Sequence, residues 1–154
     1  MKILSIDTSS NICGVSILDD SNLICNLDCD TGRTHSENLM PMIKDALSKA
    51  NLTLNEIGLI VCDIGPGSFT GIRIGIATVK AFNDSLNIPC IGISSLESLA
   101  YNVDDNSNLV CSILDCKNSN CYFALYELID GTYNVLESPT SDSVENVLNL
   151  LSTK

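Results

Sequence analysis

Apolar residues in the first part of the chain fall into three short runs that polar residues separate. The runs span residues 3–6, 13–18 and 23–27, and mostly Asp, Ser, Asn and Thr lie between them. Short apolar runs bounded by such residues are typical of strands joined by tight turns. The pattern predicts an antiparallel meander of three strands. Its first run is mostly apolar, so we expect that strand to lie inside a larger sheet.

Two helices are predicted next, with a buried strand at residues 59–62 between them. The first follows Thr34-His35-Ser36-Glu37, a Thr-x-x-Glu capping box, and Pro41 indicates either a kink or a start near residue 40. The second spans residues 71–86. The apolar positions with helical spacing are Leu39, Met40, Ile43, Leu47 and Ala50 in the first helix and Ile72, Ile76, Val79 and Leu86 in the second.

The polar run at residues 104–108 is the best candidate for a domain boundary, which divides the chain into domains 1–104 and 105–154. Before it, a strand at 88–93 and a short helix from a second capping box at 94–97 are expected. After it, the pattern predicts further strands and an amphipathic last helix. The predicted later strands span 109–114, 121–128 and 133–136, and the helix carries Val144, Val147, Leu148 and Leu151.

A glycine-rich loop joins the predicted strand 59–62 to the helix after it. A strand, a tight loop and a helix N-terminus can aim backbone N–H groups at an anion, and glycines also let a helix pack very closely. The loop lacks the lysine of a Walker P-loop and the spacing of a nucleophile elbow. A nucleotide contact and a purely structural turn both remain open. The candidate nucleotide contacts are Asp7, Gly65, Gly67 and Ser68.

Charge and cysteine usage narrow the function classes. The 154 residues carry a net charge of −11, and the eight Lys and Arg residues are scattered, which argues against direct nucleic-acid binding. Eight cysteines occur without a Cys-x-x-Cys pair, and His35 is the only histidine, so zinc spacing is absent. We expect reduced thiols, no metal site, no membrane span and a cytoplasmic location. His35 is better explained by the turn that opens its helix than by general-base catalysis.

Four motifs occur together and in order, at residues 6–9 (IDTS), 34–37 (THSE), 65–75 (GPGSFTGIRIG) and 92–97 (GISSLE). With them the chain closely resembles the TsaB (YeaZ-like) family of bacterial tRNA threonylcarbamoyladenosine biosynthesis proteins, over residues 1 to about 128. The family commonly has Asp-Ala-Arg where this chain reads Asp115-Cys116-Lys117.

The resemblance implies an α/β fold of the actin-like ATPase (ribonuclease H-like) type, with a second, incomplete lobe of the same type in a truncated chain. It implies a non-catalytic scaffold subunit without a cofactor. The catalytic paralogue TsaD and the ATPase TsaE are the implied partners, and tRNA is met only through the complex. The alternative is a nucleotide-binding actin-like ATPase or transferase that acts on its own.

The two predicted helices are the candidate partner surface. Gly71 and Gly75 would let a partner helix approach closely, and the same surface would form a homodimer when the paralogue is absent. Part of this surface must also cover the protein's own sheet. The candidate interface residues are Leu39, Met40, Ile43, Ile72, Gly75, Ile76 and Val79.

Overall fold

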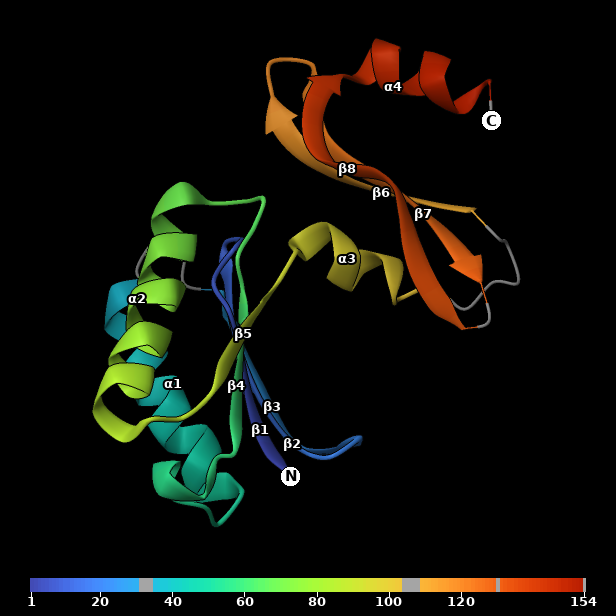
Figure 1. Cartoon of the computed structure of the whole chain (residues 1–154). Helices are drawn as coiled ribbons and strands as arrows, with labels where there is room; N and C mark the ends of the chain where they lie inside the picture. Colours follow the sequence, from blue (N-terminus) through green and yellow to red (C-terminus); the bar gives the residue numbers. More distant parts are fainter. Residues whose placement is uncertain (31–34, 104–108, 130, 154) are drawn as a thin grey trace. The chain divides into compact units, whose positions relative to one another are not determined.

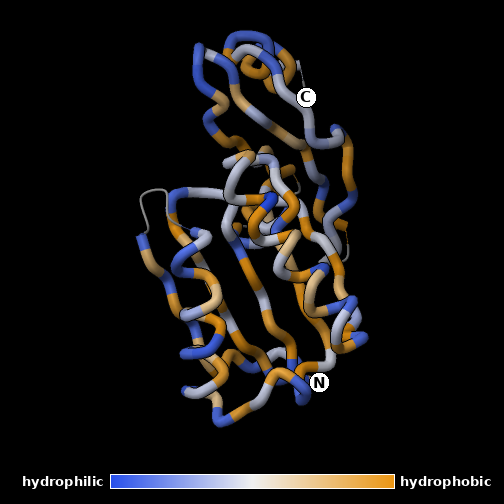
Figure 2. The backbone as a smooth tube through the Cα atoms, turned by 90° about the vertical axis from the view of Figure 1, so that its left-hand side faces the viewer, coloured by the Kyte–Doolittle hydropathy of each residue, from blue (hydrophilic) through white to orange (hydrophobic). Residues whose placement is uncertain are grey.

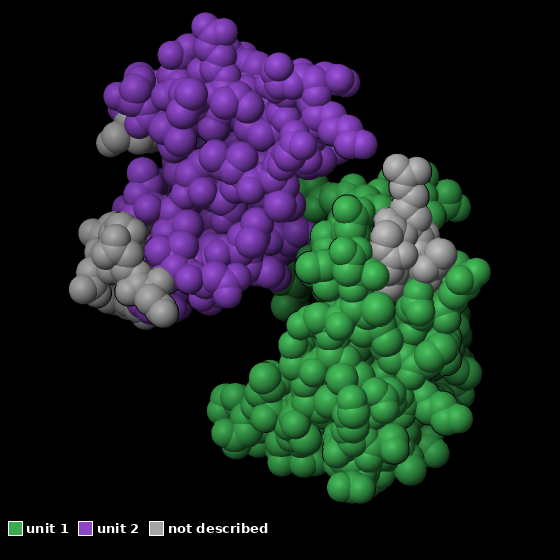
Figure 3. Space-filling model, turned by 180° about the vertical axis from the view of Figure 1, so that it is seen from behind, with its two compact units in different colours: residues 1–93 green, residues 94–154 purple. Residues whose placement is uncertain are grey.

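The computed structural model describes residues 1–30, 35–103, 109–129 and 131–153. The chain forms two compact units, Met1–Ile93 and Ser94–Lys154 (Figure 3). Each unit has its own β-sheet and its own hydrophobic core.

A five-stranded sheet with the strand order β3-β2-β1-β4-β5 forms the first unit. Strands β1, β2 and β3 pair antiparallel, as the meander pattern predicts, while β4 and β5 continue from β1 in parallel. Strand β1 therefore lies in the middle of the sheet, where its apolar run placed it. The bounds are β1 Lys2–Asp7, β2 Ile12–Asp19, β3 Asn22–Asp30, β4 Leu59–Asp63 and β5 Cys90–Ile93.

Helices α1 (His35–Lys49) and α2 (Phe69–Leu86) lie on the same side of this sheet (Figure 1). Pro41 lies inside α1, so this helix does not start near residue 40. The residue expected to cap it, Thr34, lies outside the described residues. A short 3₁₀ helix, η1 (Leu54–Glu56), precedes β4. The core between helices and sheet includes Leu4, Ile6, Val15, Ile17, Leu39, Ile43, Ile60, Val79 and Phe82.

Orange hydrophobic and blue hydrophilic positions alternate along the strands and helices in Figure 2, which displays the patterning that produced these elements. In β1, for example, Leu4 and Ile6 are buried against the helices, while Ser5 between them is half-buried. Successive side chains of a strand point to opposite faces, so this alternation puts one face of the sheet into the core.

The second unit contains the antiparallel sheet β6-β7-β8, with one helix before it and one after it. The predicted strands 109–114 and 121–128 are both present and pair as an antiparallel hairpin, and the last strand is much longer than the predicted 133–136. The bounds are α3 Ser95–Ala100, β6 Leu109–Lys117, β7 Asn120–Ile129, β8 Thr132–Ser143 and α4 Val144–Leu151.

Helix α3 packs with the second sheet, although the boundary predicted at 104–105 assigns it to the first domain. Leu96 and Ala100 of α3 share a buried cluster with Val110, Ala124 and Tyr126 of the sheet. The predicted boundary residues lie in the part of the chain that is not described, so the lobe division at 104–105 stays a prediction.

None of the helices in the described ranges is both long enough and apolar enough to cross a membrane.

Candidate functional site

Asp7 ends strand β1 and lies at the rim of a cavity of about 310 Å³. Its carboxylate accepts a hydrogen bond of 2.8 Å from the backbone N–H of Ser9, which is the turn-forming role that the sequence left open. Asp28 of β3 brings a second carboxylate to the same cavity. The cavity is lined by Ser5, Asp7, Ser10, Ile12, Gly14, Ser16 and Asp28.

The glycine-rich loop packs on the turn that follows β1. Gly65 has a φ of +96°, a conformation that favours glycine, and its N–H donates to the Asp63 carboxylate at 2.6 Å. The Ser68 N–H donates to the Ser9 carbonyl at 2.6 Å. A Cβ on Gly67 would lie only 2.3 Å from the same carbonyl oxygen, so glycine is needed for this approach.

The start of helix α2 has a capping residue from the glycine-rich loop. The Ser68 hydroxyl caps it by accepting from the Gly71 N–H at 3.3 Å. One candidate nucleotide contact, Ser68, therefore has a structural role, and Gly65 and Gly67 are likewise explained by loop packing. A nucleotide contact at these residues stays a prediction.

The close-approach glycines of α2 face inward, which corrects the expectation that they admit a partner helix. A Cβ on Gly71 would lie 1.9 Å from the Thr8 carbonyl oxygen, and one on Gly75 would lie 2.6 Å from the Thr8 hydroxyl. That hydroxyl donates to the Gly71 carbonyl at 2.8 Å. The segment that packs against these glycines is the turn after β1 of the same chain, and side chains at residues 71 and 75 would clash with it. His35 also joins this contact, with its Nε2 2.8 Å from the Ser10 carbonyl oxygen.

The seven candidate interface residues separate into two groups. Leu39, Ile43, Val79 and Gly75 are buried in the first unit, so they are not available to a partner, which is a second correction. Helical spacing alone marks an apolar face without saying what covers it. The candidates that remain are Met40, which is half exposed, and Ile72 and Ile76, which are partly buried.

Phe69 is an exposed residue that the sequence reasoning missed. It begins α2 and is 74% exposed, and the Arg73 guanidinium lies over its ring, 5.2 Å from the ring centroid. An aromatic residue in the first turn of a helix, directly after a capping serine, was the available signal, because the apolar stripe of α2 begins only at Ile72.

An apolar groove of about 310 Å³ lies between helix α1 and the residues that follow it, with Met40 at its edge. Phe82 of α2 also contributes to it, and Lys44 and Ser48 are its polar members. The groove is lined by Met40, Ile43, Lys44, Leu47, Ser48, Leu52, Leu54 and Phe82.

The chemistry available in the first unit is limited. Burial raises the pKa of the Cys13 and Cys62 thiols to about 11, so neither is an activated nucleophile. Within the described ranges, no three His, Cys, Asp or Glu side chains come together in a way that would hold a metal ion.

The expected actin-like ATPase fold implies a bound nucleotide, and the cavity beside Asp7 is the candidate site for its phosphates. Its lining includes two carboxylates, Asp7 and Asp28, and no Lys or Arg. A phosphate group brought to this cavity without a cation would be repelled. The residues that line the cavity therefore do not fit a nucleotide phosphate on their own.

Comparison with known proteins identifies the relatives of the chain. The family model of TsaD, the tRNA N6-adenosine threonylcarbamoyltransferase, matches residues 29–154. The chain is 34% identical to the tRNA threonylcarbamoyladenosine biosynthesis protein TsaB of Bacillus subtilis, over 85% of the chain and 57% of that protein. It is 30% identical to TsaB of Escherichia coli, over 82% of the chain and 55% of that protein. The chain thus spans little more than half the length of these relatives.

Solved structures agree on the fold. YeaZ from Pseudomonas aeruginosa superposes with a TM-score of 0.79 at 28% identity, covering 91% of the chain and 66% of that protein. An exopolyphosphatase from Cytophaga hutchinsonii superposes with a TM-score of 0.50 at 12% identity, covering 97% of the chain and 53% of that protein, which bears on the fold alone. The predicted actin-like ATPase fold is thereby confirmed.

Proposed function

This chain belongs to the threonylcarbamoyltransferase family of TsaD, on its TsaB (YeaZ) branch, and we propose that it is a scaffold subunit of the complex that forms threonylcarbamoyladenosine in tRNA. In this role it binds the catalytic paralogue TsaD, works with the ATPase TsaE and meets tRNA only through the complex. The complex carries out the modification in the anticodon loop of tRNAs that read codons beginning with A, and this chain is not itself an enzyme.

The exposed apolar surface at the start of α2 carries this proposal. Phe69 is exposed in the first turn of α2, the partly buried Ile72 and Ile76 follow it on the same helix, and half-exposed Met40 lies on neighbouring α1. A large exposed aromatic residue with an arginine stacked on it is the composition typical of an interface hot spot. The groove beside Met40 adds further apolar surface next to α1. In the absence of TsaD the same surface would pair two copies of the chain.

Charge supports an indirect role toward tRNA. The net charge is −11, and among the described basic side chains Lys2 is paired with Asp19, Lys49 with Asp45, and Arg73 lies on Phe69. Binding of nucleic acid relies on clustered cations that neutralise phosphates. A subunit with this charge needs a partner to hold the tRNA.

The test is a substitution of Phe69 by Asp in the full chain, followed by affinity measurement with purified TsaD. A charge in the centre of an apolar interface should weaken binding at least about tenfold, since truncation of a hot spot costs roughly 2 kcal/mol or more. Leu148→Asp is the matched control, because Leu148 is 59% exposed on α4 of the other unit. Wild-type affinity for Phe69→Asp, with unchanged circular dichroism, would refute this interface.

The alternative function, a nucleotide-binding ATPase that acts alone, has one feature in its favour, the cavity beside Asp7. It requires that the isolated chain bind and turn over ATP with Mg²⁺. Calorimetry and phosphate release measure this directly, and we expect neither tight binding nor turnover, because the cavity lining lacks a basic side chain.

A further inference from the structure

Two thiols lie directly opposite each other on neighbouring strands of the first unit. Cys13 of β2 and Cys29 of β3 are register partners in the antiparallel pair. Such partners have Cα atoms about 4.5–5.5 Å apart and side chains on the same face of the sheet. Disulfides span Cα separations of about 4.4–6.8 Å. We propose that Cys13 and Cys29 form a redox-sensitive cross-strand pair that hydrogen peroxide converts to a disulfide.

The two thiols differ in ways that assign each a step. Cys29 is exposed near the end of β3, whereas Cys13 has no exposed surface and lies in the core. Burial, with smaller contributions from the neighbouring Cys29 and Asp7, raises the pKa of Cys13 to about 11. The oxidant therefore reaches Cys29 first, because the thiolate of an accessible cysteine is the reactive species.

The reaction balances with peroxide as the oxidant. The Cys29 sulfur attacks one peroxide oxygen, the O–O bond breaks, and the hydroxide released takes the Cys29 proton as water, which leaves a sulfenic acid. The Cys13 sulfur then attacks the Cys29 sulfur, the S–O bond breaks, and hydroxide leaves with the Cys13 proton as a second water. Two thiols have lost two electrons and two protons, and peroxide has been reduced to two waters.

Other cysteines of this unit lack the same arrangement. Cys25 lies on the same strand as Cys29 but is opposite Ile17. Cys62 and Cys90 lie on the parallel neighbours β4 and β5, where Cys62 is opposite Gly92 and Cys90 is opposite Ile60. Only the Cys13–Cys29 pair, among the cysteines of the strands described here, has two thiols in direct register.

The link would join the ends of β2 and β3 on the face of the sheet that packs against α1. It closes the β2–β3 hairpin opposite its turn at Asp20 and Ser21, so oxidation would fix the register of a pair that already contains an irregularity between Ile17 and Leu18.

The test treats the folded full chain with hydrogen peroxide, blocks remaining thiols and maps peptides without reduction. The wild type should yield a peptide pair joined through Cys13 and Cys29, lighter than the sum of its parts by two hydrogen atoms. Cys29→Ser should abolish the link, and because Cys29 is exposed this variant should fold normally. The control Cys25→Ser should retain it.

Two results would overturn the proposal. One is a wild-type chain in which Cys29 proceeds to sulfinic acid while Cys13 remains a free, blockable thiol. The other is a Cys25→Ser chain that loses the link, which would place the reactive thiol at Cys25.

Discussion

Because Gly71 has no side chain, helix α2 can pack directly against the turn after β1. The helix approaches so closely that the Thr8 hydroxyl donates to the Gly71 carbonyl, and the next turn of the helix, at Gly75, meets the same threonine. The sequence predicted close packing at these glycines, because no other residue permits it. It did not reveal the neighbour, since nothing local to residues 71–75 identifies a contact with Thr8, more than sixty residues earlier in the chain.

Replacement of Gly71 by Ala should destabilise the protein by about 1–3 kcal/mol or more, because the added Cβ overlaps the Thr8 carbonyl and the backbone must shift. Urea unfolding measures the change. Gly14→Ala is the control, since its Cβ would meet Asp28 at an ordinary distance of 3.4 Å, and it should be neutral or slightly stabilising. Equal stabilities for the two variants would contradict this account of the helix packing.

At the scale of elements, periodicity predicted most helices and strands correctly, and the exceptions have physical causes. Pro41 left open a kink or a start near residue 40, and only the late start is wrong: α1 begins at His35 and includes Pro41, because packing of Leu39 and Ile43 in the core outweighs the local cost of the proline. Strand β8 extends over residues 137–143, which are rich in Ser, Thr and Asp, because β7 beside it supplies backbone partners. Pairing of that kind is nonlocal and leaves little trace in hydrophobic pattern.

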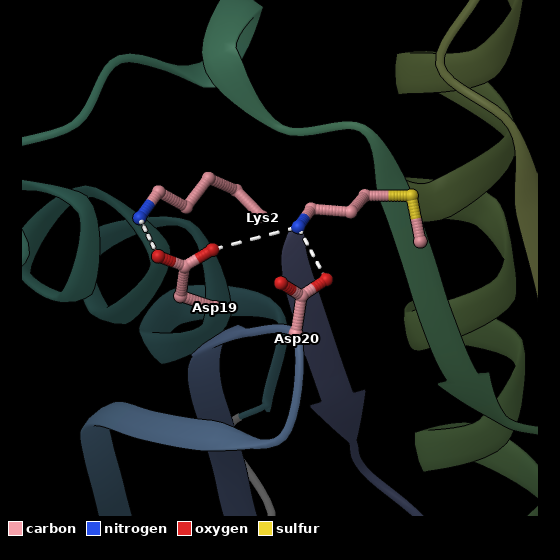
Figure 4. Close-up of polar contacts among 4 residues, drawn as sticks. Lys2, Asp19 and Asp20 are labelled. Atoms are coloured by element: carbon pink, nitrogen blue, oxygen red, sulfur yellow. Dashed lines mark hydrogen bonds and ion pairs between the residues drawn. The ribbon is translucent and has the colours of Figure 1, made fainter.

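Ion pairs connect the N-terminus and the first residue of β1 to the end of β2 and the turn that follows it. The Met1 amino group lies 2.5 Å from Asp20 and 3.5 Å from Asp19, and the Lys2 ammonium lies 2.6 Å from Asp19 (Figure 4). The hydrogen bond to Asp20 raises the pKa of the Met1 amine above its ordinary 8.0. The hydrogen bond from Lys2 lowers the pKa of Asp19 below its ordinary 3.8.

These shifts predict a pH window. The raised pKa of the Met1 amine gives a contribution to folding stability that is complete below pH 8.0 and is lost as pH rises through the folded-state pKa. The lowered pKa of Asp19 gives a contribution to folding stability that is lost as pH falls below 3.8. Asp20→Asn should therefore lower the melting temperature slightly at pH 7 and converge with the wild type at alkaline pH. Asp84→Asn on α2 is the control. A difference that persists at alkaline pH would count against the amine contact.

At the scale of the whole molecule, the sequence indicated the fold and family correctly but not the available surface. The motifs of residues 6–9 and 65–75 meet where the glycine loop packs on the β1 turn, so their co-occurrence reflects one structural contact. Which apolar residues remain exposed depends on how two helices share one sheet. That division left Met40 accessible and buried Leu39, its neighbour in the chain.

The position of β3 at the end of the first sheet bears on how the protein can be handled. A terminal strand offers backbone groups to which another chain can add, and β3 also exposes Leu23 and Ile24. At neutral pH, Asp28 and Asp30 on this strand and the strong overall negative charge keep copies apart. Near the isoelectric point of about 4.1 that repulsion vanishes. Concentrated stocks should then precipitate edge to edge, so purification and storage belong well above this pH.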